Sequence, residues 1–169
     1  MKVINLFGGS GSGKSTTAAG LFYLMKTNNY NVELVTEVAK DYVWEQRTQC
    51  LKDQLYVTAN QNHRLDRIKD KVDWAIMDSP LILNLSYMPK NYYKSFKNLS
   101  LELFESYDNI NFFINRVNPY CEIGRLETED ESNKISLDIK NLLNKYDYKE
   151  INGDSDAIKK IFNEIKNHG

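Results

Sequence analysis

The chain has 169 residues, of which 41% are hydrophobic and 27% charged, and its formal net charge at pH 7 is −1. These values are typical of a single soluble globular domain, and the near-neutral charge excludes a global basic field that would wrap nucleic acid. No apolar run approaches the roughly 18 residues of a membrane helix, so we expect no membrane partner.

Cysteine usage and the N-terminal residues predict a cytoplasmic protein. Cys50 and Cys121 are far apart and fit no metal-ligand spacing, so we expect both thiols to be reduced. The first residues enter an apolar strand at once, which is not the pattern of a signal peptide. His63 and His168 are isolated in the sequence, and we assign no role to either.

The first predicted strand, residues 2–7, is apolar and β-branched and is followed by a glycine-rich motif. The motif reads Gly8-Gly9-Ser10-Gly11-Ser12-Gly13-Lys14-Ser15 and matches the G-x-x-x-x-G-K-[ST] phosphate-binding pattern. Residues 14–27 have apolar side chains at three- and four-residue steps, which predicts a helix. A strand, a glycine loop and a helix in this order favour nucleotide binding over a glycine-rich turn without a ligand.

This phosphate loop (residues 8–15) has the residue types that a triphosphate requires. Glycines allow backbone N–H groups to point inward at phosphate oxygens, and the helix that follows favours an anion. We expect Lys14 to neutralise the β- and γ-phosphates of ATP, and the Ser15 hydroxyl to bind Mg²⁺. The predicted nucleotide-binding residues are Gly8, Gly9, Ser10, Gly11, Ser12, Gly13, Lys14, Ser15 and Thr16.

The second predicted strand, residues 32–36, leads into a predicted helix over 37–45. Glu37 stands at this junction, where a carboxylate would take the proton from an acceptor hydroxyl. The alternative is an ordinary glutamate at a helix N-terminus, where the helix dipole favours it. Asp41, one helical turn later, is a weaker candidate for a substrate or metal contact.

A long helix is predicted over residues 52–71, with polar residues Gln54, Gln61, Arg64 and Arg67. A glutamine can bind a nucleobase edge and an arginine can hold a phosphate. An equally good interpretation is a solvated helix face.

The third predicted strand, residues 74–77, ends on Asp78, and Pro80 then breaks the strand. An acid at the end of a buried strand is a typical second Mg²⁺ ligand, so we assign Asp78 and Ser15 to the metal. The alternative for Asp78 is a cap of the following turn.

Aromatic and lysine residues interleave over residues 84–98, before a helix predicted over 99–107. Such a segment can bind a nucleotide or a single strand by stacking and phosphate contacts. The alternative, which we favour, is an amphipathic surface segment that covers the substrate pocket.

The fourth predicted strand, residues 111–115, precedes a polar segment over residues 116–133. We interpret this lid segment as a flap whose Arg116 and Arg125 reach the phosphates when it closes over ATP. A solvated surface loop is the alternative.

The remaining elements are a helix marked by Ile135 to Leu143, a fifth strand over 148–152 and a closing helix over 157–166. Alternation of strands and helices predicts an α/β class, three-layer P-loop fold: a five-stranded parallel sheet, helices on both faces and a small lid. We expect one domain over 1–169. The main argument for an active site is that Gly8, Glu37, Asp78 and Arg116 all follow strands, because ligands bind at that sheet edge.

Three further motifs extend the likeness to known proteins. They are Glu37-Val38-Ala39-Lys40, Asp78-Ser79-Pro80, and Gly124-Arg125 followed by Leu126-Glu127-Thr128-Glu129. With the phosphate loop, they resemble the P-loop nucleoside and nucleotide kinase group, and more closely small phage-type ATP-binding proteins similar to the nicotinamide riboside kinase domain. The Asp-Gly-x-Pro-Arg motif of adenylate kinases and the Glu-Arg-Ser motif of deoxynucleoside kinases are absent from the sequence.

The resemblance implies an ATP- and Mg²⁺-dependent kinase that phosphorylates a hydroxyl of a nucleoside- or nucleotide-like small molecule. Lys14, Glu37, Asp78, Arg116 and Arg125 would be its catalytic residues. One alternative is a phage kinase that acts on a hydroxymethylated pyrimidine in DNA, since similar proteins do so. A third hypothesis, from another class, is a nucleotide-dependent switch or ATPase module. The oligomeric state stays open, with a homodimer among the options.

Overall fold

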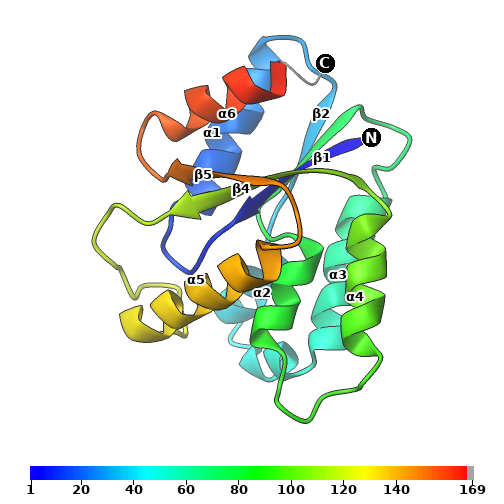
Figure 1. Ribbon diagram of the computed structural model, residues 1–169, viewed down its shortest axis with the longest axis vertical. Helices are drawn as coiled ribbons and strands as arrows, with labels where there is room; N and C mark the ends of the chain where they lie inside the picture. Colours follow the sequence, from blue (N-terminus) through cyan, green and yellow to red (C-terminus); the bar gives the residue numbers. More distant parts are fainter. Residues whose placement is uncertain (167–169) are drawn as a thin grey trace.

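A computed structural model describes residues 1–166 as a parallel β-sheet flanked by helices (Figure 1). The five strands lie in the order β2-β3-β1-β4-β5, and each pair of neighbours runs parallel. Their bounds are β1 Lys2–Phe7, β2 Val32–Val35, β3 Trp74–Met77, β4 Asp108–Asn115 and β5 Tyr148–Asn152. The predicted α/β class and five-stranded parallel sheet are confirmed. His168 lies outside the described residues.

Helices cover both faces of the sheet (Figure 1). One face carries α1 (Lys14–Thr27) and α6 (Ala157–Lys166), and the other carries α3 (Gln54–Asp66), α4 (Phe96–Glu105) and α5 (Glu129–Leu143). The short helix α2 (Val38–Trp44) packs against α3, and two 3-10 helices, η1 (Thr48–Lys52) and η2 (Leu81–Tyr87), complete the chain. None of the helices in residues 1–166 is long and apolar enough to cross a membrane.

The central strand β1 is buried on both faces, which is why its sequence is almost continuously apolar. Ile4 and Leu6 point to the α1 and α6 side, where they pack with Leu21 of α1 and Ile161 of α6. Val3 and Phe7 alternate to the opposite side and join a core with residues of α3, α4 and α5. The core residues contributed by those helices are Leu65, Phe104, Ile139 and Leu143.

Two predicted helices have different bounds in the structure. The helix predicted over 52–71 is α3, which starts after the Asp53 cap and ends at Asp66, before Asp70 adopts a left-handed φ of 63°. The helix expected from Ile135 is α5, which begins at Glu129. Thr128 and Glu131 form a capping box there, so the end of the lid segment, residues 129–133, is helical.

Two smaller differences concern the segment between β3 and β4. Residues Leu81, Ile82 and Leu83 of η2 are buried. Within the aromatic and lysine segment of residues 84–98, Asn84 and Phe96 are buried, and most of the other residues are exposed. The helix expected over 99–107 is α4, Phe96–Glu105, and strand β4 starts earlier than expected, at Asp108.

The strand order positions the site. Because β1 lies between β3 and β4, the phosphate loop after β1 has the end of β3 on one side and the end of β4 on the other. Asp78 follows β3, Arg116 follows β4, and Glu37 follows β2 beside β3. Four segments distant in sequence therefore meet at the carboxyl edge of the sheet, as predicted.

Candidate active site

The phosphate loop curls around its own lysine. Lys14 Nζ donates hydrogen bonds to the carbonyl oxygens of Gly8 at 2.9 Å and Gly9 at 3.0 Å. Gly13, with φ of 96°, caps α1, so the first N–H groups of that helix face the loop. The Ser12 hydroxyl is buried within the loop, and no partner for it is present among the described residues. A buried polar group of this kind, beside free amides, favours an anion in the loop.

Helix α5 and the turn after strand β5 pack closely against the phosphate loop. Ser132 of α5 donates to the carbonyl oxygen of Ser10 at 2.8 Å. A Cβ atom on Gly9 would lie 2.6 Å from the carbonyl oxygen of Ser132, and one on Gly153 would lie 2.1 Å from that of Ser12. Both glycines are therefore required by close backbone approach, and the loop shape is held before any ligand arrives.

Asp78 and Ser15 have the chemistry of a magnesium site. Asp78 is 4% exposed, and its Oδ1 atom has no hydrogen-bond partner within residues 1–166. Ser15 lies on the wall of the cavity that the phosphate loop borders. An orphaned carboxylate oxygen and a hydroxyl beside a phosphate site fit a hard cation that takes its remaining ligands from phosphate and water.

Glu37 stands at the N-terminus of α2 and lies on the wall of the same cavity. Burial raises the pKa of its carboxyl, Lys14 opposes that rise, and the charges of Asp78 and Glu127 add to it. These charges place the Glu37 carboxyl within electrostatic range of the phosphate loop. A carboxylate with a raised pKa beside the γ-phosphate position fits a general base.

The cavity extends from the phosphate loop to residues of α2 and α3, and its volume is about 390 Å³. Gln54 of α3 contributes a buried carbonyl oxygen, Oε1, that no described group satisfies, while its Nε2 atom donates to Leu51 O at 2.6 Å. Tyr87 also lines this end, and its partial burial, with the charges of Glu127 and Glu37, raises the pKa of its hydroxyl. The apolar wall consists of Val43, Trp44, Leu51, Val57, Leu83, Ile123 and Leu126.

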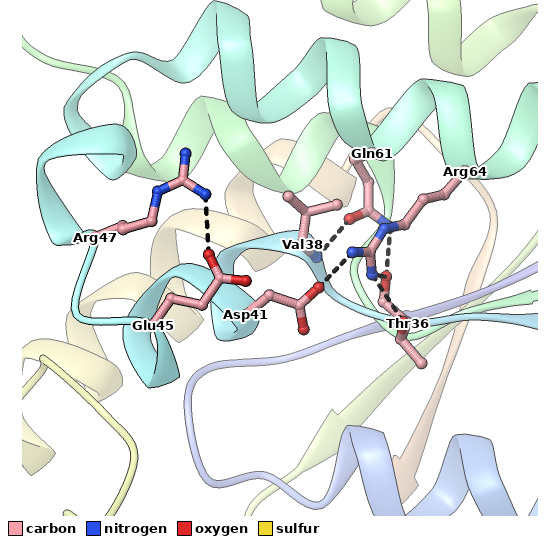
Figure 2. A network of polar contacts seen from close by, with 7 residues as sticks. All are labelled: Thr36, Val38, Asp41, Glu45, Arg47, Gln61 and Arg64. Atoms are coloured by element: carbon pink, nitrogen blue, oxygen red, sulfur yellow. Dashed lines mark hydrogen bonds and ion pairs between the residues drawn. The ribbon is translucent and has the colours of Figure 1, made fainter.

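Gln61 and Arg64, proposed from the sequence as ligand contacts, hold the Glu37 segment in place (Figure 2). Gln61 Oε1 accepts from Val38 N at 2.9 Å, and its Nε2 donates to Thr36 O at 3.2 Å. Arg64 forms an ion pair with Asp41 and donates to Thr36 Oγ1 at 2.9 Å. These side chains cap α2 and hold the turn before it, and the cavity wall includes none of them.

The lid segment lies against the phosphate loop. Arg125 lines the cavity, and Arg116 forms an ion pair with Glu129 at 3.3 Å and a hydrogen bond with Asn133. The Nη1 atom of each arginine is buried, and neither has a partner in the described part of the chain. Two orphaned cationic donors beside an anion-binding loop fit the phosphate contacts expected of them.

Comparison with known proteins gives a family and a fold. A family model described as an AAA domain matches residues 3–157. The chain belongs to this AAA-domain family. No curated protein sequence matches the chain.

Solved structures share the fold of this AAA domain over nearly its whole length. Deoxyadenosine kinase from M. mycoides, solved with dCMP and dCDP, aligns with a TM-score of 0.62 at 21% identity, over 99% of this chain and 100% of that chain. Shikimate kinase from Aquifex aeolicus aligns with a TM-score of 0.58 at 17% identity, over 99% of this chain and 98% of that chain. The resemblance to the P-loop nucleoside and nucleotide kinase group is thereby confirmed at the level of fold.

Tyr120 of this AAA domain was not singled out from the sequence, and Glu127 was noted there only as part of the motif over residues 124–129. Tyr120 contacts both lid arginines, and Glu127 lies on the cavity wall near Glu37. The sequence pattern that could have indicated Tyr120 is an aromatic residue between two arginines in a segment with few apolar residues. Arg67, in contrast, follows the last turn of α3, is exposed and is not part of the cavity wall.

Proposed function

We propose that this AAA domain is an ATP- and Mg²⁺-dependent kinase that transfers the γ-phosphoryl group to a hydroxyl of a nucleoside-like acceptor. The observation that carries the proposal is the position of Glu37, which shares one cavity with Lys14 and has a carboxyl pKa raised by burial. The cavity that begins at the phosphate loop continues past Glu37 to Gln54 and Tyr87, which gives space for an acceptor that a simple ATPase does not need. The shared fold with deoxyadenosine kinase and shikimate kinase supports the same class of reaction.

On the donor side, the loop amides and Lys14 would hold the triphosphate. Lys14 would exchange the Gly8 and Gly9 carbonyl oxygens for the β- and γ-phosphates. Bound Mg²⁺, held by Ser15 and Asp78, would neutralise charge on the phosphate oxygens. Arg116 and Arg125 would place their free Nη1 donors against the negative charge on the phosphates.

On the acceptor side, Glu37 would accept the hydroxyl proton while the acceptor oxygen attacks the γ-phosphorus. The bond from the γ-phosphorus to the β–γ bridging oxygen breaks, and ADP leaves. Glu127 and Tyr87 lie on the same cavity wall, where a carboxylate and a phenol would bind a second hydroxyl of a sugar.

The charges of the acceptor end favour a nucleoside over a nucleotide. An acceptor phosphate would need an arginine or lysine at the far end of the cavity. Arg64 is paired with Asp41 and Arg67 lies outside the cavity, while Glu37 and Glu127 make this wall acidic. Lys40 is the one further cation on the described wall besides Lys14 and Arg125. Because the two carboxylates of Glu37 and Glu127 outnumber Lys40 on this wall, we expect a neutral acceptor.

Transfer of label from γ-labelled ATP tests the proposal. The acceptors would be nucleosides, their 5′-monophosphates, nicotinamide riboside, and DNA with and without hydroxymethylated pyrimidines. We expect label on a nucleoside. Label on DNA alone would replace the small-molecule acceptor by the DNA base, and ATP binding without any labelled acceptor would favour a switch or ATPase module.

A further inference from the structure

The ring of Tyr120 contacts the guanidinium groups of both lid arginines. The Cζ atom of Arg116 lies 5.0 Å from the ring centroid, and that of Arg125 lies 5.2 Å from it. Two like charges this close to one another repel, and the electron-rich face of an aromatic ring offsets that repulsion by attracting each of them. Tyr120 therefore allows two cations to be held together before any anion is bound.

The same ring lies over the phosphate loop. A Cβ atom on Gly11, which has φ of 77°, would lie 3.2 Å from Tyr120 Cδ2 and 3.4 Å from Arg125 Cζ. The ring and the guanidinium of Arg125 thus cover the loop where the phosphates would lie. A side chain at position 11 would crowd both groups, and the left-handed φ there itself favours glycine.

Arg125 depends on Tyr120 more than Arg116 does. Arg116 is also fixed by its ion pair with Glu129 and its hydrogen bond with Asn133. For the Arg125 side chain, the structure over residues 1–166 shows no hydrogen bond or ion pair, and its Nη1 atom is buried without a partner. Its guanidinium lies over the Tyr120 ring and close to Gly11 of the phosphate loop.

The hydroxyl of Tyr120 reaches the acceptor side of the cavity. It donates a hydrogen bond of 2.5 Å to the carbonyl oxygen of Glu127, whose side chain contributes to the cavity wall. The hydroxyl also interacts with the Ser10 side chain of the phosphate loop. One side chain therefore contacts the arginines of the donor side with its ring, and both the phosphate loop and the backbone of the acceptor wall with its oxygen.

We infer that Tyr120 is a positioning residue: its ring holds Arg125 over the phosphate loop, and its hydroxyl fixes Glu127 at the acceptor wall. The kinetic part of this inference rests on the proposed kinase function, whereas the part that concerns Arg125 requires only nucleotide binding. The two roles belong to different atoms, so different substitutions separate them.

Nucleotide binding tests the role of the ring without any acceptor. The affinity for a non-hydrolysable ATP analogue divided by the affinity for ADP, both measured with Mg²⁺, reports contacts with the γ-phosphate. Tyr120→Leu should lower this ratio about fivefold, whereas Tyr120→Phe, which keeps the ring, should leave it within about twofold. Tyr23→Leu, an exposed tyrosine of α1, is the matched control and should leave the ratio unchanged.

A double-mutant cycle with Arg125→Ala separates positioning from a general structural effect. If Tyr120 acts through Arg125, then Tyr120→Leu should change the ratio less than about twofold once Arg125 is alanine. The inference would be overturned if Tyr120→Leu lowered the affinity ratio by the same factor with and without Arg125. It would also be overturned if the Tyr120→Leu protein kept the wild-type ratio. Tyr120 is half-buried on the lid segment, so thermal melting should show that its variants are folded. If Tyr120→Leu does unfold, Tyr120→Ala replaces it. A lowered affinity ratio in Tyr120→Ala, together with the wild-type ratio in Tyr120→Phe, would then support the role of the ring.

Phosphoryl transfer tests the role of the hydroxyl. Tyr120→Phe should raise the KM for the acceptor about threefold with kcat nearly unchanged, because the hydrogen bond to Glu127 is lost while the ring stays in place. An unchanged acceptor KM in Tyr120→Phe would remove the hydroxyl from the inference. If the wild-type protein binds ATP and labels no acceptor, the proposed function fails, and the nucleotide affinity ratio still decides whether Tyr120 positions Arg125.

Discussion

Lys14 Nζ donates to the carbonyl oxygen of Gly8 at 2.9 Å, so the lysine is bound to the backbone of its own phosphate loop. The carbonyl oxygens of Gly8 and Gly9 accept the hydrogen bonds of the Lys14 ammonium group that phosphate oxygens would accept when a nucleotide binds. A bound triphosphate offers charged oxygens in place of neutral ones, and charge-assisted hydrogen bonds are stronger. Lys14 therefore exchanges one set of acceptors for a better one when the nucleotide binds.

Lys14→Ala should abolish phosphoryl transfer and leave folding nearly intact. A preorganised cationic donor beside the γ-phosphate is worth about 100-fold or more in kcat. The side chain is partly exposed and its partners are loop carbonyls, so its loss should change the melting temperature little. Label transfer from γ-labelled ATP and thermal melting measure the two effects.

Lys94→Ala is the matched control for Lys14→Ala. Lys94 is exposed on the segment before α4 and is not part of the cavity wall, so its loss should affect neither measurement. Full transfer activity in the Lys14→Ala protein would contradict the nucleotide-binding assignment as a whole.

Glu37→Gln should lower kcat about 100-fold or more and preserve the affinity for ATP. The base must be ionised to accept a proton, and burial raises the pKa of Glu37. The kcat of the wild-type protein should therefore fall as the pH drops through a value above that of an ordinary glutamate, which is 4.5. In the Glu37→Gln protein this limb of the pH profile should disappear. Glu45→Gln, on the outer edge of α2, should retain it.

The same raised pKa has a consequence for stability. A carboxyl whose folded-state pKa exceeds its unfolded value binds more protons in the folded state, so it destabilises the fold as the pH rises through that interval. At a pH above the raised pKa, Glu37→Gln should consequently unfold at a higher temperature than wild type, and the difference should vanish below pH 4.5. A less stable Glu37→Gln protein at neutral pH would show that Glu37 is a structural helix residue.

The elements that carry chemistry were predictable because local sequence determines them. The glycine pattern from Gly8 to Ser15 requires a particular backbone shape, and Asp78 directly follows a short buried strand. Placement at one sheet edge followed from the parallel alternation of strands and helices. Periodicity also located α1 and α6, which bury one stripe against the sheet.

The roles of polar residues on α3 were not predictable, because they depend on tertiary contacts. Gln54, Gln61 and Arg64 are equally polar in the sequence, and only the folded chain shows that Gln54 faces the cavity while the other two bind the turn before α2. The start of α5 was placed late because the acidic residues from Glu129 onward have no apolar periodicity. Their helix depends on the capping box of Thr128 and Glu131.

Gln61→Ala should destabilise the protein, whatever its ligand. Gln61 is 2% exposed and accepts a hydrogen bond from the buried amide of Val38, so its removal leaves that amide without its partner, whereas the Thr36 carbonyl keeps its contact with Arg64. The expected loss is about 1–3 kcal/mol in the free energy of unfolding, measured by urea denaturation. Asn60→Ala on the same helix, where the amide bonds only Tyr56 O within α3, should cost far less. Equal stability of Gln61→Ala and wild type would reopen a ligand-binding role for Gln61.

Gln54→Leu should weaken binding of the acceptor and leave ATP binding unchanged. The Nε2 atom of Gln54 is committed to Leu51 O, so Oε1 is left as a buried, unsatisfied hydrogen-bond acceptor on a residue that lines the cavity. An amino group on the base edge would satisfy that oxygen, and a keto group would not. Leucine has a similar volume and no acceptor atom, so the KM for an amino-bearing nucleoside should rise about tenfold.

The selectivity of Gln54→Leu is the sharper part of this prediction. Wild type should prefer adenine or cytosine nucleosides over those with hypoxanthine or uracil, and Gln54→Leu should remove most of that preference. Gln49→Leu, on the exposed side of η1, is the control and should retain it. Steady-state kinetics with the two pairs of nucleosides measure the preference. A wild-type protein that phosphorylates the keto-bearing nucleosides equally well would show that a group other than Gln54 Oε1 recognises the base.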